Sequence, residues 1–239
     1  MNDTQHIASA FDRDLDNIQA LIMKMGGLVE TAISDASKAL ELRDTDMAEI
    51  VRKNDKLIDA LEEEVATEVA RVIAMRSPTA GDLRTVLSVL KISGNLERVG
   101  DYAKNLAKRT SVLAEMQAVD GTGASIRRMA KLVSVMLKDA LDAYIQRDAD
   151  LAADVRARDT EVDQMYNALF REFLTHMMED PRNITACMHL HFIAKNIERM
   201  GDHVTSISEQ VIYLVTGEVP DEDRDKADQT SYVTATKES

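Results

Sequence analysis

Apolar residues recur three and four positions apart along most of the chain, which is the spacing of one face of an α-helix. Leu83, Val86, Leu87 and Leu90 form one such run, with polar side chains at most of the positions between them. The pattern is interrupted only at short segments, and these divide the chain into six predicted helices. The helices are expected over Ile7 to about Leu42, Asp46 to about Met75, Asp82 to about Gln117, Ser125 to about Gln146, from Asp150 to a turn at 179–183, and from there to about Val215.

The predicted helix ends carry recognisable signals. Asp46 and Glu49 have the spacing of a capping box, which predicts that the second helix starts at Asp46. Pro78 and Pro181 each lie in a turn that closes a helical hairpin, and Gly217 takes the place of a C-terminal cap. Residues 218–239 are polar and charged, so we expect a flexible acidic tail there.

The chain repeats itself. The segment 43–48, which begins at Arg43, recurs from Arg147 at an offset of 104 residues, and the segment 95–101 recurs as 196–202 at an offset of 101. An internal repeat of three helices predicts a duplicated fold. We therefore expect an all-α protein with a first repeat over 1–117, a linker over 118–124 and a second repeat over 125–217.

Composition and charge limit the functions that this protein can have. The formal net charge of −13 disfavours direct nucleic-acid binding, because a phosphate backbone would be repelled. Cys187 is the only cysteine, which excludes an internal disulfide and fits a reducing compartment. The N-terminus lacks an export signal and no apolar stretch approaches the length of a membrane span, so a cytoplasmic protein is expected, with any membrane contact through a partner.

Four pairs of acidic residues stand out, because the two members of each pair are four residues apart and share a helix face. The pairs are Asp55 and Asp59, Glu97 and Asp101, Asp159 and Asp163, and Glu198 and Asp202. Asp59 and Glu97 each lie 19 residues from Pro78, and Asp55 and Asp101 each lie 23 residues from it. In a tight hairpin, residues equidistant from the turn lie at one level. Two carboxylates from each arm should therefore meet, and the second half repeats the arrangement around Pro181 within one residue.

An acidic solvated face is the simplest alternative, but the acids interrupt an apolar seam that includes Val69 and Val86. Gly100 and Gly201 each separate the acids of one pair in a helix interior, where glycine costs about 1 kcal/mol relative to alanine. A close approach at the acids and a simple packing notch explain these glycines equally well. Four carboxylates at one level need cations, and an all-oxygen set suits Mg²⁺, Mn²⁺, Ca²⁺ or iron. His191 shares the face of Glu198 but is not repeated in the first half, so it reads either as local variation or as an added ligand.

At this point the motifs resemble those of the PhoU family, regulators attached to bacterial high-affinity phosphate transport. The resemblance rests on 82–84 leading into 96–103, and on 196–203, each preceded by two aspartates four apart. It covers the chain to about Gly217. It implies two three-helix bundles related by pseudo-twofold symmetry, and multinuclear metal clusters on the eight carboxylates. It also implies a non-enzymatic, often dimeric repressor of the phosphate-starvation response that links the phosphate-import ATPase to a membrane histidine kinase.

Two other functions stay open at this stage. A carboxylate-bridged metalloenzyme would carry Glu-x-x-His pairs, and this sequence has none. A structural helical scaffold without metal would use the acids for solubility and register only. Arg98 and Arg199, each beside an acidic pair, would form local salt bridges or reach a partner protein.

Overall fold

The computed structural model describes residues 2–220 of the chain, with side chains from residue 10 onward. Within this part, the predicted all-α fold is confirmed. The helices are α1 (Asn2–Leu42), α2 (Thr45–Arg76), α3 (Ala80–Ala114), α4 (Thr122–Gln146), α5 (Ala149–Glu179) and α6 (Ile184–Thr216), with a 3₁₀ turn η1 (Pro181–Asn183) before α6. The predicted acidic tail lies largely outside the described residues, since these stop at 220.

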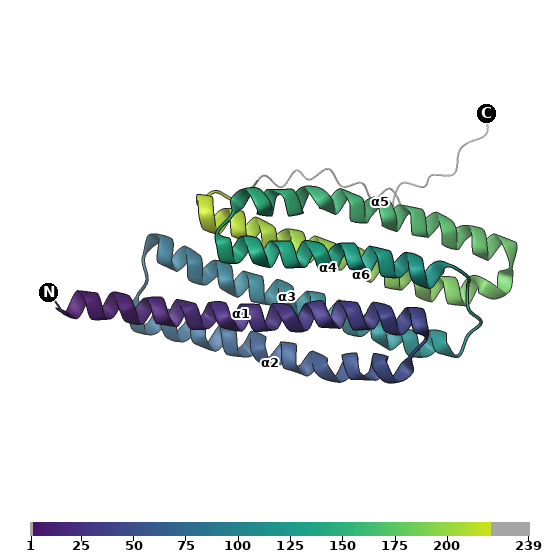
Figure 1. Cartoon of the computed structure of the whole chain (residues 1–239), viewed down its shortest axis with the longest axis horizontal. Helices are drawn as coiled ribbons and strands as arrows, with labels where there is room; N and C mark the ends of the chain where they lie inside the picture. The colour runs from purple at the N-terminus through teal and green to yellow at the C-terminus, as the bar shows by residue number, and fades with distance from the viewer. Residues whose placement is uncertain (1, 221–239) are drawn as a thin grey trace, which may run out of the picture.

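The six helices form two three-helix bundles that lie side by side (Figure 1). Helices α1, α2 and α3 contact one another, and so do α4, α5 and α6. The bundles join through contacts of α1 with α4 and of α3 with α6, which are equivalent helices of the two repeats. The predicted pseudo-twofold arrangement of the halves is thereby confirmed.

The core runs along the inside of both bundles and across their junction. Each helix contributes aliphatic side chains that are at most a few per cent exposed, among them Ile22, Val65, Leu96, Met136, Val162 and Ile197. Such burial is the main favourable contribution to the stability of the fold. No helix within residues 2–220 is long and apolar enough to cross a membrane.

The starts of α2 and α5 repeat one capping arrangement. The Asp44 carboxylate accepts a hydrogen bond from the backbone N–H of Met47, and Asp148 does the same for Asp150 and Leu151. The predicted start of the second helix at Asp46 was therefore wrong by one residue, and its cap lies two residues earlier. Asp44 has the extended backbone that an N-cap residue needs, which the Asp46 spacing alone did not reveal.

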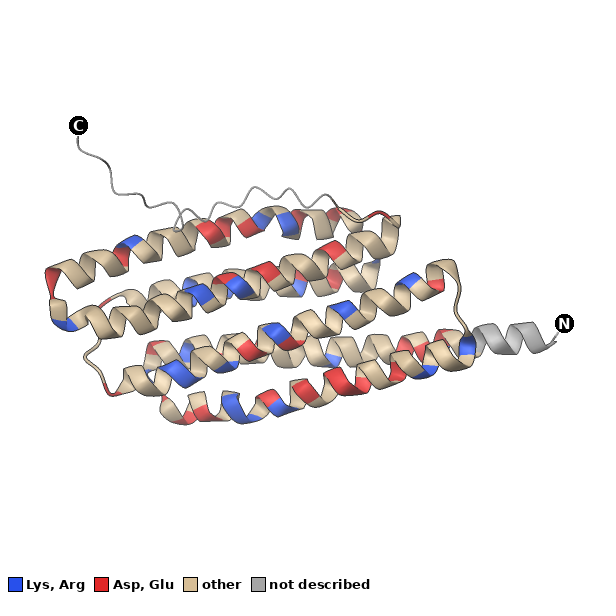
Figure 2. Cartoon of the chain, turned by 180° about the vertical axis from the view of Figure 1, so that it is seen from behind, with Lys and Arg blue, Asp and Glu red and all other residues tan. Residues whose placement is uncertain are grey.

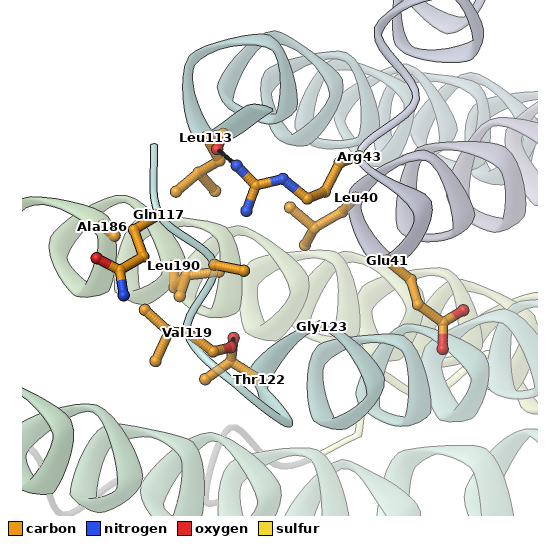
Figure 3. A pocket seen from close by; sticks show the side chains of 11 residues that line it. Leu40, Glu41, Arg43, Leu113, Gln117, Val119, Thr122, Gly123, Ala186 and Leu190 are labelled. Atoms are coloured by element: carbon orange, nitrogen blue, oxygen red, sulfur yellow. Dashed lines mark hydrogen bonds between the residues drawn. The ribbon is translucent and has the colours of Figure 1, made fainter. Parts of the chain in front are cut away.

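Arg43 links the end of α1 to the end of α3 in the first bundle. Its guanidinium donates to the carbonyl oxygens of Leu113 and Met116, where α3 ends. Figure 3 shows this side chain pointing toward Leu113 at the rim of a small pocket. The pocket, of about 90 Å³, is bounded by the ends of α1 and α3 and by the start of α4. Because Arg43 satisfies carbonyl groups that the helix itself leaves free, we assign this region a structural role.

Candidate metal centres

The first candidate centre is on the hairpin formed by α2 and α3. The turn between these helices is tight, with Ser77 and Ala80 at φ of 47° and 43°. From this turn α2 and α3 run antiparallel and contact each other (Figure 1). Asp55 is buried at 4% exposure, whereas the other three carboxylates, at Asp59, Glu97 and Asp101, are partly exposed.

Asp55 and Asp101 face each other across the hairpin, as their spacing predicted. The ammonium group of Lys104 lies between them, with its Nζ 2.5 Å from Oδ2 of Asp55 and 3.3 Å from Oδ1 of Asp101. One ammonium group can contact both carboxylates only if they lie at the same level of the bundle. The level of the first centre that contains Asp55 and Asp101 therefore already holds a cation, the ammonium group of Lys104.

Asp59 and Glu97 form the second level of the first centre. Burial raises the pKa of the Glu97 carboxyl, and the nearby charges of Asp101 and Asp59 raise it further. Burial also raises the pKa of Asp59, and the charges of Asp55 and Asp101 add to this despite the opposing effect of Lys104. Burial is the largest cause of both shifts and the acidic neighbours add to it, so a nearby cation would favour the charged form of each carboxyl.

The second candidate centre, on α5 and α6, is more buried than the first. Asp159, Asp163 and Glu198 are each at most 8% exposed, and Asp202 is half-buried. Lys195 Nζ lies 2.8 Å from Oε1 of Glu198, while Oε2 of Glu198 is buried and has no hydrogen-bond partner among the described residues. Burial raises the pKa of Glu198 and outweighs the lowering effect of Lys195, and the charges of Asp202 and Asp163 raise it further.

The two glycines stand where adjacent helices approach closely. A Cβ atom added to Gly100 would lie 2.9 Å from Cδ1 of Ile58 and 3.8 Å from Oδ1 of Asp55. At Gly201 it would lie 3.1 Å from Oδ1 of Asp159 and 3.3 Å from Cγ1 of Val162. Each glycine faces both a packed aliphatic side chain and an aspartate of its centre. The packing notch and the close approach at the acids therefore both apply.

The two histidines near the second centre are held by other groups. The His191 ring lies among the rings of Tyr166, Phe170 and Phe192, with centroids 5.4 to 5.9 Å away. The ring nitrogen Nδ1 of His203 lies 2.8 Å from the side-chain oxygen of Asn95 in the other half. The His191 ring thus packs among aromatic side chains, and its role as an added ligand stays a prediction.

The two arginines beside the centres are at the surface. Nε of Arg98 lies 3.4 Å from Glu97 and NH1 lies 3.6 Å from Asp101, with 60% of the side chain exposed. Arg199 is exposed as well. Contacts of this length on an exposed side chain contribute little to stability, so the Arg98 guanidinium is free to turn toward a partner.

The donor chemistry of both centres fits a hard metal ion, but the side-chain positions do not form a finished ligand set. All eight candidate ligands are carboxylates, and Oε2 of Glu198 is a buried acceptor with no donor. Across the side chains described, those of residues 10–220, however, no three Asp, Glu, His or Cys residues are arranged to hold a metal ion. Binding would therefore need the carboxylates to turn toward a shared point, and their role as ligands stays a prediction.

Sequence reasoning missed the two lysines that contact carboxylates of the centres. Lys104 follows Asp101 by three residues and Lys195 precedes Glu198 by three, a spacing that places each lysine on the face of its acid. At the offset of 101 residues, Thr205 stands where the first half has Lys104, and Gly94 stands where the second half has Lys195. The repeat comparison that found the carboxylates thus hid the lysines, because neither lysine is repeated.

Comparison with known proteins places the chain in one family. The PhoU domain family matches residues 22–110 and 126–211, one segment in each half. A phosphate-specific transport system accessory protein PhoU homologue of Caulobacter vibrioides is 45% identical over 95% of this chain and 99% of its own length. The Rhizobium meliloti homologue is 44% identical, with 95% of each chain covered.

Solved structures agree with the sequence comparison. The crystal structure of PhoU from Pseudomonas aeruginosa superposes with a TM-score of 0.84 at 38% identity, covering 87% of this chain and all of that one. The phosphate transport system regulatory protein PhoU from Streptococcus pneumoniae gives a TM-score of 0.82 at 32% identity, with 88% and 99% covered. The duplicated six-helix fold is therefore shared along nearly the whole chain.

Proposed function

The chain belongs to the PhoU family, whose members are accessory and regulatory proteins of phosphate transport, and we propose that it acts as a regulatory adaptor of phosphate import. In this role it represses the phosphate-starvation response while phosphate is plentiful, by linking the transporter ATPase to a sensor histidine kinase. The observation that carries the proposal is the 45% identity to an accessory protein along almost the entire length of both chains. The adaptor has no catalytic step of its own, and we expect it to act at the inner face of the membrane as a homodimer.

The adaptor role can be tested in the cells that produce this protein. Deleting its gene should raise the output of a phosphate-starvation promoter in phosphate-rich medium, and restoring the gene should lower it again. A pull-down from phosphate-replete cells should recover the transporter ATPase and the kinase. Unchanged promoter output together with recovery of neither partner would reject the proposal.

We further propose that the eight carboxylates bind hard metal ions, in one group of four per half. Asp55, Asp59, Glu97 and Asp101 would hold the first group, and Asp159, Asp163, Glu198 and Asp202 the second. A bound ion would place positive charge beside Glu97 and Glu198, whose pKa values are raised, and would favour their charged forms. It would also link the two arms of each hairpin. Carboxylate oxygens favour Mg²⁺, Mn²⁺ or iron over Zn²⁺.

Two lysines would compete with the metal ions for the carboxylates. Lys104 and Lys195 each contact a carboxylate that a metal ion would need, so metal and ammonium compete for the same oxygens. Elemental analysis of protein purified without chelator should find Mn, Mg or Fe. Titration of chelated protein with Mn²⁺ should show binding that weakens sharply in an Asp55→Ala plus Asp101→Ala variant. Equal binding by this variant and the parent would reject the first centre, and a metal-free scaffold would then be the better description.

A further inference from the structure

A groove with basic and amide side chains opens between α3 and α6, and none of the eight candidate metal ligands lines it. Its volume is about 400 Å³, and its lining residues are Asn105, Lys108, Arg109, Val112, His189 and Asn196. None of these residues is acidic, although the chain has 42 acidic and 29 basic residues. Figure 2 shows how frequent the acidic positions are elsewhere, for example along α2, the lowest helix of that view. The lining is therefore basic, whereas the molecule as a whole carries a net negative charge.

The contacts of Arg109 hold its guanidinium in place within the groove. The guanidinium carbon lies 4.5 Å from the centroid of the Phe192 ring, and NH1 lies 3.2 Å from Nδ1 of His189. Phe192 is 45% exposed, so this ring lies at the surface beside Arg109 instead of filling the core. Neither Lys108 nor Arg109 forms an ion pair with a carboxylate anywhere in the part of the chain that the structure describes. An arginine stacked on a ring and left without a carboxylate is prepared to bind an anion.

The duplicated half supplies an internal comparison. At the offset of 101 residues, Lys108 corresponds to Glu209 and Arg109 corresponds to Gln210. Glu209 instead receives a salt bridge of 3.2 Å from Arg156. The equivalent positions on α6 thus carry no cation, and Glu209 pairs there with a side chain of α5. The two adjacent cations are therefore specific to one side of the molecule, and neither forms an ion pair with a carboxylate among the described residues.

We propose that this groove binds a small phosphorylated polyanion of about the size of a nucleoside triphosphate. Lys108, Arg109 and the amides of Asn105 and Asn196 supply donors, and phosphoryl oxygens match the planar guanidinium in particular. The volume falls within the range of about 300 to 1,000 Å³ that is typical of small-molecule sites, and it exceeds what a single phosphate ion would fill. The exposed Phe192 ring adds an apolar face beside the donors. This inference rests on neither the adaptor role nor the metal centres.

The binding test uses the full chain with chelator present, so that phosphate cannot attach through metal ions. Fluorescence anisotropy with a fluorescent ATP analogue, and calorimetry with ATP, pyrophosphate and orthophosphate at fixed ionic strength, should show saturable binding at one site. We expect ATP or pyrophosphate to bind more tightly than orthophosphate, which has fewer charges to offer the two cations. An oligoglutamate peptide of equal charge serves as the protein-like competitor.

The variant Lys108→Glu plus Arg109→Gln introduces the residues that the other half already has at these positions. It should weaken binding by about tenfold or more, the effect of losing one charge-assisted hydrogen bond. Arg52→Gln plus Lys53→Glu on exposed α2 changes the net charge equally and should leave binding unchanged. If the double variant misfolds, Lys108→Glu alone is used, because Lys108 is exposed. Absence of saturable binding, equal loss in both double variants, or tighter binding of oligoglutamate than of ATP would each overturn the proposal.

Discussion

Replacing Gly100 by alanine tests whether the two arms of the first hairpin touch as closely as the structure places them. Alanine is favoured over glycine in a helix interior by about 1 kcal/mol. Against this gain, the new Cβ atom would lie 2.9 Å from Cδ1 and 3.4 Å from Cγ2 of Ile58. Overpacking of this kind typically costs about 1 to 3 kcal/mol. We therefore expect Gly100→Ala to lower the free energy of unfolding by roughly 0 to 2 kcal/mol.

Two further variants separate the opposing contributions. Gly94 is in the same helix with nothing within 4 Å of an added Cβ atom, so Gly94→Ala should stabilise the protein by about 1 kcal/mol. Ile58→Val removes the methyl group nearest to Gly100, and by itself it costs about 0.5 to 1.5 kcal/mol. In the Ile58→Val background, Gly100→Ala should become stabilising, and the two changes should couple by about 0.5 to 3 kcal/mol.

The assay is urea unfolding followed by circular dichroism at 222 nm on protein kept free of metal with a chelator, so that metal binding does not enter the comparison. The parent, the two single variants, the double variant and Gly94→Ala are compared at one pH. If Gly100→Ala stabilises the protein as much as Gly94→Ala does, or if no coupling with Ile58→Val is found, the close approach of α2 and α3 at the first centre is wrong.

Three other predictions follow from single contacts. Lys104→Met should destabilise metal-free protein by about 1 to 3 kcal/mol, because the buried Asp55 carboxylate loses its ammonium partner, and it should tighten Mn²⁺ binding in calorimetry; looser binding would contradict the proposed competition. Arg43→Met should cost about 1 to 3 kcal/mol in urea unfolding, because two carbonyl groups at the end of α3 lose their donor, and an unchanged midpoint would remove its structural role. Burial raises the pKa of Tyr144 to about 12 from 10.0, so stability present below pH 10 should be lost as the pH rises through 12, and Tyr144→Phe should lessen that loss in thermal unfolding at pH 9 to 11.5.

Several features of this protein follow from its sequence alone, because they depend on spacing along single helices. The recurrence of apolar residues gave six helices, and the offsets between repeated segments gave two halves. Equal distances from Pro78 placed Asp55 level with Asp101, and Lys104 now bridges the two. A helix has a fixed rise per residue, so counting residues along a hairpin measures height.

Tertiary structure decided what lies opposite each side chain. The sequence left His191 open as a ligand, and only helix rotation and side-chain rotamers showed its ring among three aromatic rings. The pairing of Arg109 with His189 joins positions 80 residues apart in the two halves, and no periodicity within one helix reports on such a contact. Spacing along a helix determines the height of a residue and the helix face that it occupies. The residues that it meets across an interface depend on how whole bundles pack, and residues far apart in the sequence contribute to that packing together.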